Sequence, residues 1–272
     1  MELKQKKLSS ADVLSKIKAV RQLTFVDGRQ PASATDDNPD LETLVVGKME
    51  LQGLMPWSSN YTFLVSLEKD ETTLLGIYKP GDGERPLWDF PDRTLSYREF
   101  ASYLVSQVLG WPSIPLTVMR NGPHGLGSVQ LFIDAEYEAH YFNLRDIPAF
   151  TEDFRQMALF DYIVNNADRK GGHCLKGKDG RIWAIDHGLT FHVEPKLRTV
   201  IWEFCDETIP DSLLKSLTHL QNLMDQSELC QVLADLISAR EIEAFKKRVD
   251  RLVSSRQFPR SRSGRNVPYP PI

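Results

Sequence analysis

Strand-like and helix-like patterns occupy different halves of this sequence, and this separation constrains the fold more than any other feature. The first half contains five β-like runs and one amphipathic helix, at 96–109, between the third run and the fourth. The runs lie at 43–51, 61–67, 73–79, 115–120 and 128–133. From residue 151 onward the pattern is mainly helical. We therefore predict an α+β fold with two lobes, a β-rich N-lobe and a mainly helical C-lobe, and a ligand site between them.

Shifts in composition mark the boundaries of these parts. An N-terminal helix and linker occupy 1–40, the N-lobe 41–133 and the C-lobe 134–255. The last segment, 256–272, has four arginines, four prolines and no acidic residue, which indicates a flexible basic and proline-rich tail. Further helices are predicted at 9–25, 151–166, 210–224, 227–238 and 239–254.

Composition narrows the class of protein. The 272 residues include 33 Lys and Arg against 37 Asp and Glu, a formal net charge of −4, so we expect no nucleic-acid partner. Three scattered cysteines do not form a disulfide framework or a CxxC metal site. The N-terminus lacks the apolar core of a signal peptide, and no run reaches the roughly 18 apolar residues of a membrane span. We expect a cytoplasmic protein without integral membrane association.

Two carboxylates in the second half carry the strongest chemical signal. Asp168 follows a predicted helix in the loop ADRKGGH, and Asp186 ends the apolar strand 181–185. A hairpin formed by this strand and another near 173–176 would bring Asp186 back toward Asp168. Two neighbouring carboxylates need a cation or a substrate to balance their charge. Phosphoryl transfer uses such a pair, one to orient the attacking hydroxyl and one to hold magnesium on the nucleotide.

Candidate nucleotide contacts lie in the first half. Lys79 ends a strand and Glu99 lies on the next helix, so the two could form a pair that directs an ammonium at nucleotide phosphates. The segment 51–63 lies between two strands, and Ser58 and Ser59 in it could bend over phosphates, although it has no GxGxxG or GxxxxGK[ST] motif. Backbone groups of the strand at 128–133 could bind an adenine ring.

Taken in order, these features resemble the phosphatidylinositol 3-/4-kinase branch of the protein-kinase-like fold, especially type II phosphatidylinositol 4-kinases. A bacterial group of kinase-like proteins of this size is also similar. The resemblance covers roughly 45–195, about half of the chain, and rests on the stretches GIYKPGDGE, YREFASYLVSQVLG, GSVQLFID, FDYIVNNADRKGGH and WAIDHGLTF.

The resemblance implies ATP, Mg²⁺ or Mn²⁺, and a hydroxyl acceptor of unknown kind: a lipid headgroup, a protein or a small molecule. It implies that Asp168 is the catalytic aspartate, that Asp186 binds metal, and that Glu99 orients Lys79 on the phosphates. It places the remaining nucleotide contacts at Ser58, Ser59, Gln130, Leu131, Phe132 and Ile133. One departure is His173, which stands where kinases usually have a metal-binding Asn; imidazole suits manganese better than magnesium.

Alternatives to a kinase stay open at the level of sequence. His173 and the missing glycine-rich motif favour a pseudokinase that acts as a binding module, and the same fold could transfer AMP in place of phosphate. A metallohydrolase built on His173, Asp186, His187 and His192 is disfavoured because these residues lack any established ligand spacing. Lys196 and Arg198 could meet an anionic headgroup, but their interpretation as surface charges is favoured.

Overall fold

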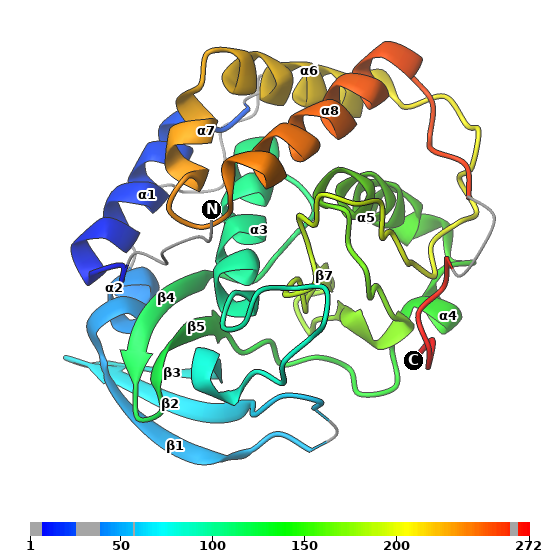
Figure 1. The fold of residues 1–272 in the computed structure, drawn as a ribbon. Coiled ribbons are helices and arrows are strands. Elements are labelled where there is room, and N and C mark those ends of the chain that lie inside the picture. The colour runs from blue at the N-terminus through cyan, green and yellow to red at the C-terminus, as the bar shows by residue number, and fades with distance from the viewer. Residues whose placement is uncertain (1–6, 26–38, 57, 262–265) are drawn as a thin grey trace.

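The computed structural model describes residues 7–25, 39–56, 58–261 and 266–272. The N-lobe is built on a five-stranded antiparallel sheet with the strand order β1-β2-β3-β5-β4 (Figure 1). Its strands are β1 (Lys48–Leu54), β2 (Phe63–Lys69), β3 (Thr72–Pro80), β4 (Thr117–Gly122) and β5 (Gly125–Leu131). The predicted sheet of five strands is therefore confirmed. Since β5 ends at Leu131, Phe132 and Ile133 belong to the connection that leaves the sheet for the C-lobe.

One predicted strand begins too early. Residues 43–46 belong to helix α2 (Pro39–Val46), and only residue 48 onward is β1. The run TLVV is rich in residues that favour strands, but Leu41, Leu44 and Val45 recur at helical spacing and are buried. Burial of that face outweighs the local propensity. Helix α2 packs on β2 and β3, and the predicted linker at 27–40 lies, up to residue 38, outside the described residues.

Helix α3 (Leu95–Leu109) is the centre of the molecule and is less amphipathic than its sequence suggests. Fourteen of its fifteen residues are buried, including all its polar ones except Gln107. On one side it packs against β4 and β5, and on others against α1 (Ser10–Leu23) and α6 (Asp211–Asp225). A helix that is enclosed on all sides must satisfy its polar side chains internally. The partners of these side chains define much of the site described below.

The C-lobe is mainly helical, as predicted. It contains α4 (Tyr141–Leu144), α5 (Thr151–Val164), α6, α7 (Glu228–Leu233) and α8 (Ala239–Ser255), with short 3₁₀ turns at Pro148–Phe150 and Gly171–His173. A further 3₁₀ turn, Gly81–Gly83, lies in the N-lobe. A small hairpin of β6 (Cys174–Lys176) and β7 (Ile182–Ala184) follows α5. The α+β architecture of a β-rich N-lobe and a helical C-lobe is thus confirmed.

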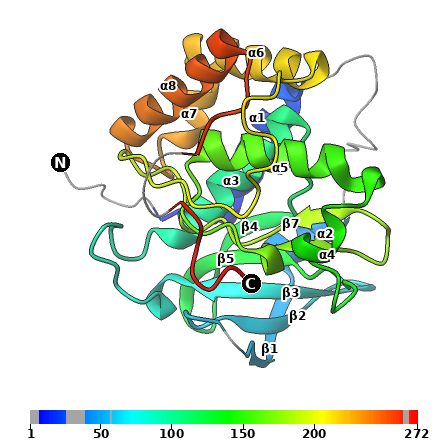
Figure 2. The same ribbon diagram turned by 90° about the vertical axis from the view of Figure 1, so that its right-hand side faces the viewer.

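The C-terminal tail differs from the expected free segment. Figure 2 shows it, in red, running along the C-lobe. The ring of Phe258 is buried, the Asn266 carbonyl accepts a hydrogen bond from the Thr199 amide at 3.0 Å, and the Pro271 carbonyl accepts one from the Gly171 amide at 2.7 Å. Aromatic and carbonyl groups of the tail therefore pack on and hydrogen-bond to the C-lobe. The prediction of a flexible tail used only its charge and proline content, which do not indicate these contacts. Among the described residues, no helix has the length and apolar character needed to cross a membrane.

Candidate active site

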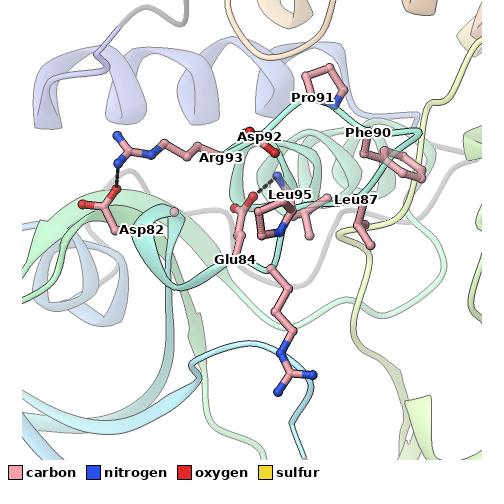
Figure 3. Close-up of a pocket in the computed structure, with 11 residues that line it drawn as sticks. Asp82, Glu84, Leu87, Phe90, Pro91, Asp92, Arg93 and Leu95 are labelled. Atoms are coloured by element: carbon pink, nitrogen blue, oxygen red, sulfur yellow. Dashed lines mark hydrogen bonds and ion pairs between the residues drawn. The ribbon is translucent and has the colours of Figure 1, made fainter.

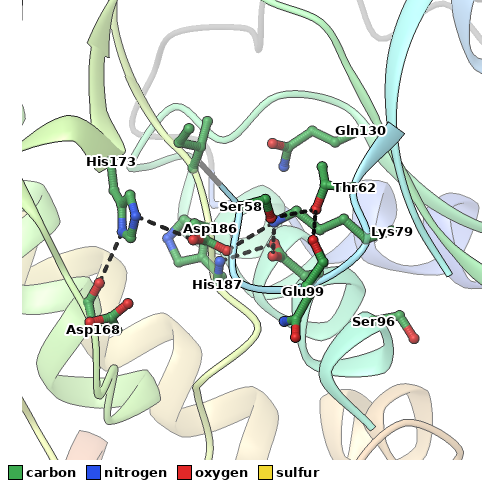
Figure 4. A network of polar contacts seen from close by, with 12 residues as sticks. Ser58, Thr62, Lys79, Ser96, Glu99, Gln130, Asp168, His173, Asp186 and His187 are labelled. Atoms are coloured by element: carbon green, nitrogen blue, oxygen red, sulfur yellow. Dashed lines mark hydrogen bonds and ion pairs between the residues drawn. The ribbon is translucent and has the colours of Figure 1, made fainter. Parts of the chain in front are cut away.

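Three predicted residues from distant parts of the chain meet at one ammonium group. The Lys79 Nζ lies 2.5 Å from Glu99 Oε1 and 2.9 Å from Asp186 Oδ1 (Figure 4). Lys79 is near the end of β3, Glu99 is on α3, and Asp186 follows β7. Glu99 is buried, whereas the Asp186 side chain is 45% exposed. The ammonium and one carboxylate are thus held by the N-lobe, and the second carboxylate reaches them from the C-lobe.

The position of Glu99 depends on how α3 begins. Thr94 provides no side-chain cap for the helix. Instead the Glu84 carboxylate accepts the amide hydrogens of Leu95 and Ser96, at 3.0 and 2.9 Å. A carboxylate at this end also interacts favourably with the helix dipole. The loop between β3 and α3 therefore fixes the start of the helix that carries Glu99.

The same loop, between β3 and α3, lines a pocket. Figure 3 shows its lining, which includes the Asp82–Arg93 ion pair at 2.8 Å and the capping Glu84; the full lining is Gly81, Asp82, Glu84, Arg85, Pro86, Leu87, Phe90, Pro91, Asp92, Arg93 and Leu95. None of the predicted site residues lines this pocket.

The turn at Asp186 is shaped to meet α3. Asp186 has a φ of +61°, a left-handed conformation that is uncommon for a residue with a side chain. The next amide, of His187, donates to the second oxygen of Glu99 at 3.0 Å. A Cβ at Gly188 would lie 3.3 Å from the Leu95 Cβ, so glycine permits the close approach of the turn to the helix. The DHG sequence thereby joins the turn at Asp186 to the Lys79–Glu99 pair.

Asp168 reaches this cluster through His173. The imidazole Nδ1 lies 2.9 Å from the backbone oxygen of Asp168, and Nε2 lies 3.2 Å from Asp186 Oδ2 (Figure 4). The Asp168 carboxylate itself lies 3.4 Å from Lys170 Nζ. The hairpin predicted from sequence is present, and it brings Asp186 to His173. Through its backbone carbonyl, Asp168 thus joins His173, Asp186, Lys79 and Glu99 in one series of contacts.

The surroundings shift the ionisation of these groups in different directions. Burial raises the pKa of Asp168 to about 6, with the charge of Asp186 adding to the effect and Lys170 opposing it. Desolvation would also raise the pKa of Asp186, but the charge of the Lys79 ammonium and its hydrogen bond hold that pKa below its usual range. Burial lowers the pKa of His173 to about 4. His173 is consequently a neutral imidazole near neutral pH, and Asp186 is a carboxylate.

These two residues fit a divalent cation. A neutral imidazole has one N–H group, yet His173 faces an acceptor oxygen at each ring nitrogen. If Nδ1–H donates to the Asp168 carbonyl, the Nε2 lone pair faces the Asp186 carboxylate, and a cation there would satisfy both. Mg²⁺ commonly uses one or two protein ligands together with nucleotide phosphates and water, and imidazole also suits Mn²⁺. No group of three or more His, Cys, Asp or Glu suited to a metal occurs in the described part of the chain, so other ligands would come from the nucleotide and water.

The other predicted nucleotide contacts are only partly available. Ser58 and Ser59 are exposed in the loop between β1 and β2, and Ser58 Oγ pairs with Thr62 Oγ1 at 2.8 Å. The Leu131 amide donates to Leu116 O, and the Phe132 amide donates to Leu75 O. Adenine contacts from these two residues would therefore have to use their carbonyl oxygens.

Two further residues near the predicted adenine site are Gln130 and Ile133. Gln130 is buried, and its amide group donates to Thr117 Oγ1 at 2.9 Å, so it stabilises the β4–β5 pair. Ile133 lies in the connection after β5, the position from which its backbone could meet a ring.

The sequence did not reveal the buried arginine behind the site. Arg169 is fully buried and makes a forked ion pair with Asp161 on α5, at 2.9–3.1 Å. Its guanidinium also donates to Ile185 O at 2.9 Å and to His187 Nε2 at 2.6 Å. Arg169 thus ties the loop after Asp168 to the turn after Asp186. Its place directly beside a candidate catalytic aspartate was the only signal available.

Lys196 also differs from a free surface charge. It is 14% exposed, pairs with Asp89 at 2.7 Å, and lies 4.9 Å from the ring of the exposed Trp88. The pair connects the β3–α3 loop to the segment after Asp186, so Lys196 would have to leave Asp89 before it could bind an anionic headgroup.

Three comparisons with known proteins gave matches. The family model "Phosphatidylinositol 3- and 4-kinase" matches residues 118–247. Protein Rv2133c of Mycobacterium tuberculosis is 37% identical over 260 residues, which cover 84% of this chain and 93% of the relative. Among solved structures, the crystal structure of the Helicobacter pylori proinflammatory kinase CtkA matches with a TM-score of 0.49 and 12% identity, covering 78% of this chain and 93% of that chain.

Proposed function

Because the chain belongs to the bacterial phosphatidylinositol 3-/4-kinase-like family, we propose that it is an ATP-dependent phosphotransferase that transfers the γ-phosphate to a hydroxyl group. The observation that carries this proposal is the Lys79 ammonium shared by Glu99 and Asp186. Kinases use a lysine held by a helix glutamate to bind nucleotide phosphates, and an aspartate beside it to hold the metal ion. The proposed contacts for the rest of the nucleotide are Ser58, Ser59 and the backbone at Gln130, Leu131, Phe132 and Ile133.

In this proposal Asp168 is the catalytic aspartate. The acceptor oxygen forms a bond to the γ-phosphorus, the bond from that phosphorus to the β–γ bridging oxygen breaks, and ADP leaves. The acceptor proton passes to the Asp168 carboxylate, which orients the hydroxyl in line with the leaving oxygen. Burial of Asp168, which raises its pKa to about 6, makes it a better proton acceptor than an exposed aspartate while leaving it mainly ionised at neutral pH.

The C-lobe provides the metal ligands. Asp186 and His173 would hold Mg²⁺ or Mn²⁺ at the positions of their facing Oδ2 and Nε2 atoms. When bound, such a cation neutralises charge on the β- and γ-phosphate oxygens. Arg169 holds the two segments that carry these ligands, since its side chain donates to both the His173 carbonyl, at 3.1 Å, and the Ile185 carbonyl.

The decisive test is Asp168→Asn. We expect loss of ³²P transfer from γ-labelled ATP to any acceptor, water included, with ATP affinity retained in calorimetry. Asp146→Asn is the matched control, because its side chain is 89% exposed beside Arg145 and does not contact the site residues. Unchanged transfer by Asp168→Asn would refute the assignment. Label that reaches the acceptor from α-labelled ATP instead would indicate AMP transfer.

A second function is favoured by one observation, the imidazole of His173 at the usual position of an asparagine. A pseudokinase would bind Mg-ATP or Mn-ATP, seen as a rise in melting temperature, without consuming it. His173→Asn distinguishes the two functions. In an active enzyme this variant shifts the metal preference of turnover from manganese toward magnesium, because an amide oxygen suits the harder ion. In a pseudokinase neither metal supports turnover by the native chain.

A further inference from the structure

A second buried arginine, Arg98, precedes Glu99 on α3 and joins three parts of the molecule. Its side chain is 1% exposed. One guanidinium nitrogen donates to Glu241 Oε1 on α8 at 2.6 Å, and another donates to the Thr190 carbonyl at 2.6 Å, in the segment after Asp186. The guanidinium also lies 5.0 Å from the centre of the Phe90 ring, in the β3–α3 loop. Arg98 therefore fixes α3 to the C-lobe at the level of the catalytic pair.

Glu241 uses its two carboxylate oxygens for different purposes. Oε2 accepts hydrogen bonds from the Ser238 amide and hydroxyl, at 2.8 and 2.7 Å, in the capping box that begins α8. Oε1 accepts the bond from Arg98. The carboxylate is 7% exposed. The Glu241 side chain thus caps the N-terminus of α8 and also binds Arg98, the residue next to Glu99.

Movement of α3 away from the C-lobe would break this contact. The arginine and the glutamate would then each lose a charged partner in a buried setting, which is strongly unfavourable. The hydroxyls of Ser102 and Thr190, 3.3 Å apart, join the same two segments. The amide of His187, which donates to Glu99 Oε2, lies in the same stretch of chain as Thr190. The position of Glu99 is consequently linked to α8 through a short series of polar contacts.

We propose that Glu241, acting through Arg98, is a positioning residue that holds α3 where Glu99 orients Lys79. The inference rests on the proposed kinase function for its kinetic consequence, but the structural link can be measured without turnover. Glu241 does not touch the nucleotide in this account. It keeps the N-lobe helix joined to the C-lobe so that the lysine and the two aspartates face one ligand.

The test distinguishes the roles of the two carboxylate oxygens of Glu241. Glu241→Gln keeps the size of the side chain and one acceptor for Ser238, but it presents a neutral amide to Arg98. Ser238→Ala removes the hydroxyl of the capping box and leaves the carboxylate on Arg98. If Glu241→Gln does not fold, Glu241→Asp replaces it: the capping box of α1, Ser9 with Asp12, shows that an aspartate can serve at this position, while the shorter chain withdraws from Arg98.

The structural readout is hydrogen exchange of the His187 amide, which reports the contact with Glu99. The Ala184 amide, bonded to Ser113 O at 2.8 Å, is the internal reference. We expect Glu241→Gln to accelerate exchange at His187 by about tenfold or more relative to Ala184, the size expected for a lost charge-assisted hydrogen bond, and Ser238→Ala to leave that ratio unchanged. Equal ratios in the native chain and Glu241→Gln, or an equal acceleration by Ser238→Ala, would overturn the proposal.

The kinetic readout distinguishes positioning from general stability. We expect Glu241→Gln to lower kcat about tenfold with the KM for ATP changed less than about threefold, because the lysine is misplaced mainly in the transition state. Ser238→Ala should retain the native kcat. A raised KM with an unchanged kcat would overturn the proposal. If the native chain transfers no phosphate while the exchange ratio rises as expected, the proposed function fails and the link between α8 and Glu99 stands.

Discussion

Replacement of Arg169 by methionine should destabilise the protein far more than loss of a surface arginine. The substitution leaves the Asp161 carboxylate fully buried, with the Asn166 amide at 2.9 Å and the Thr199 hydroxyl at 3.5 Å as its remaining side-chain contacts. Removal of one member of a buried ion pair costs about 3–5 kcal/mol. For a chain of this size that is a fall in melting temperature of about 10 °C. Urea denaturation followed by fluorescence or circular dichroism measures the change.

Two further variants show whether the buried charge is the cause. Arg181→Met is the matched control: Arg181 pairs with Asp179 at 2.7 Å but is 61% exposed, so we expect about 0–1 kcal/mol. The double variant Arg169→Met/Asp161→Leu removes both charges and should be more stable than Arg169→Met alone. A cost for Arg169→Met equal to that of Arg181→Met, or a double variant whose losses simply add, would refute the reasoning.

Two other predictions concern backbone contacts of the site. Gly127→Ala should lower ATP affinity and cost about 1–3 kcal/mol of stability, because the new Cβ would overlap the carbonyl oxygen of Lys79. The control is Gly53→Ala, whose new Cβ would have no atom within 4 Å. Equal ATP binding by the two variants would contradict the prediction. Deletion of 266–272 should accelerate hydrogen exchange at the Gly171 amide, which donates to the tail, and unchanged protection there would show that the tail does not bind the loop after Asp168.

Much of the fold was accessible from the sequence because its patterns are local. The alternation of β3 and the turns that separate the strands depend on neighbouring residues, and the sheet has the predicted five strands. Residues 43–46 were predicted wrongly because their β-branched side chains favour a strand in isolation, whereas the observed helix is stabilised by what Leu44 and Val45 pack against. That information is not present in the segment itself.

In the candidate site, too, some residues could be predicted from the sequence and others could not. Lys79, Glu99, Asp168 and Asp186 could be chosen as candidates because phosphate transfer uses an ammonium and paired carboxylates, and because their order resembles that of the kinase family. The structure brings Lys79, Glu99 and Asp186 into contact. Their buried supports could not be chosen in this way, since a charged residue in a sequence indicates exposure unless its partner is known. Arg98 and its partner lie 143 residues apart, a separation that no local pattern reveals.

The two buried arginines suggest why the supports lie where they do. Arg98 precedes Glu99 on a helix, and Arg169 follows Asp168 in a loop, so each anchor is a direct neighbour of a site residue. Adjacent side chains leave the backbone in different directions, which lets one face the ligand while the next reaches into the interior. The backbone between them is then fixed from both sides, by Glu241 on α8 and by Asp161 on α5. In the proposed kinase, a carboxylate placed in this way would need little reorganisation on nucleotide binding, and such preorganisation is a main source of electrostatic catalysis.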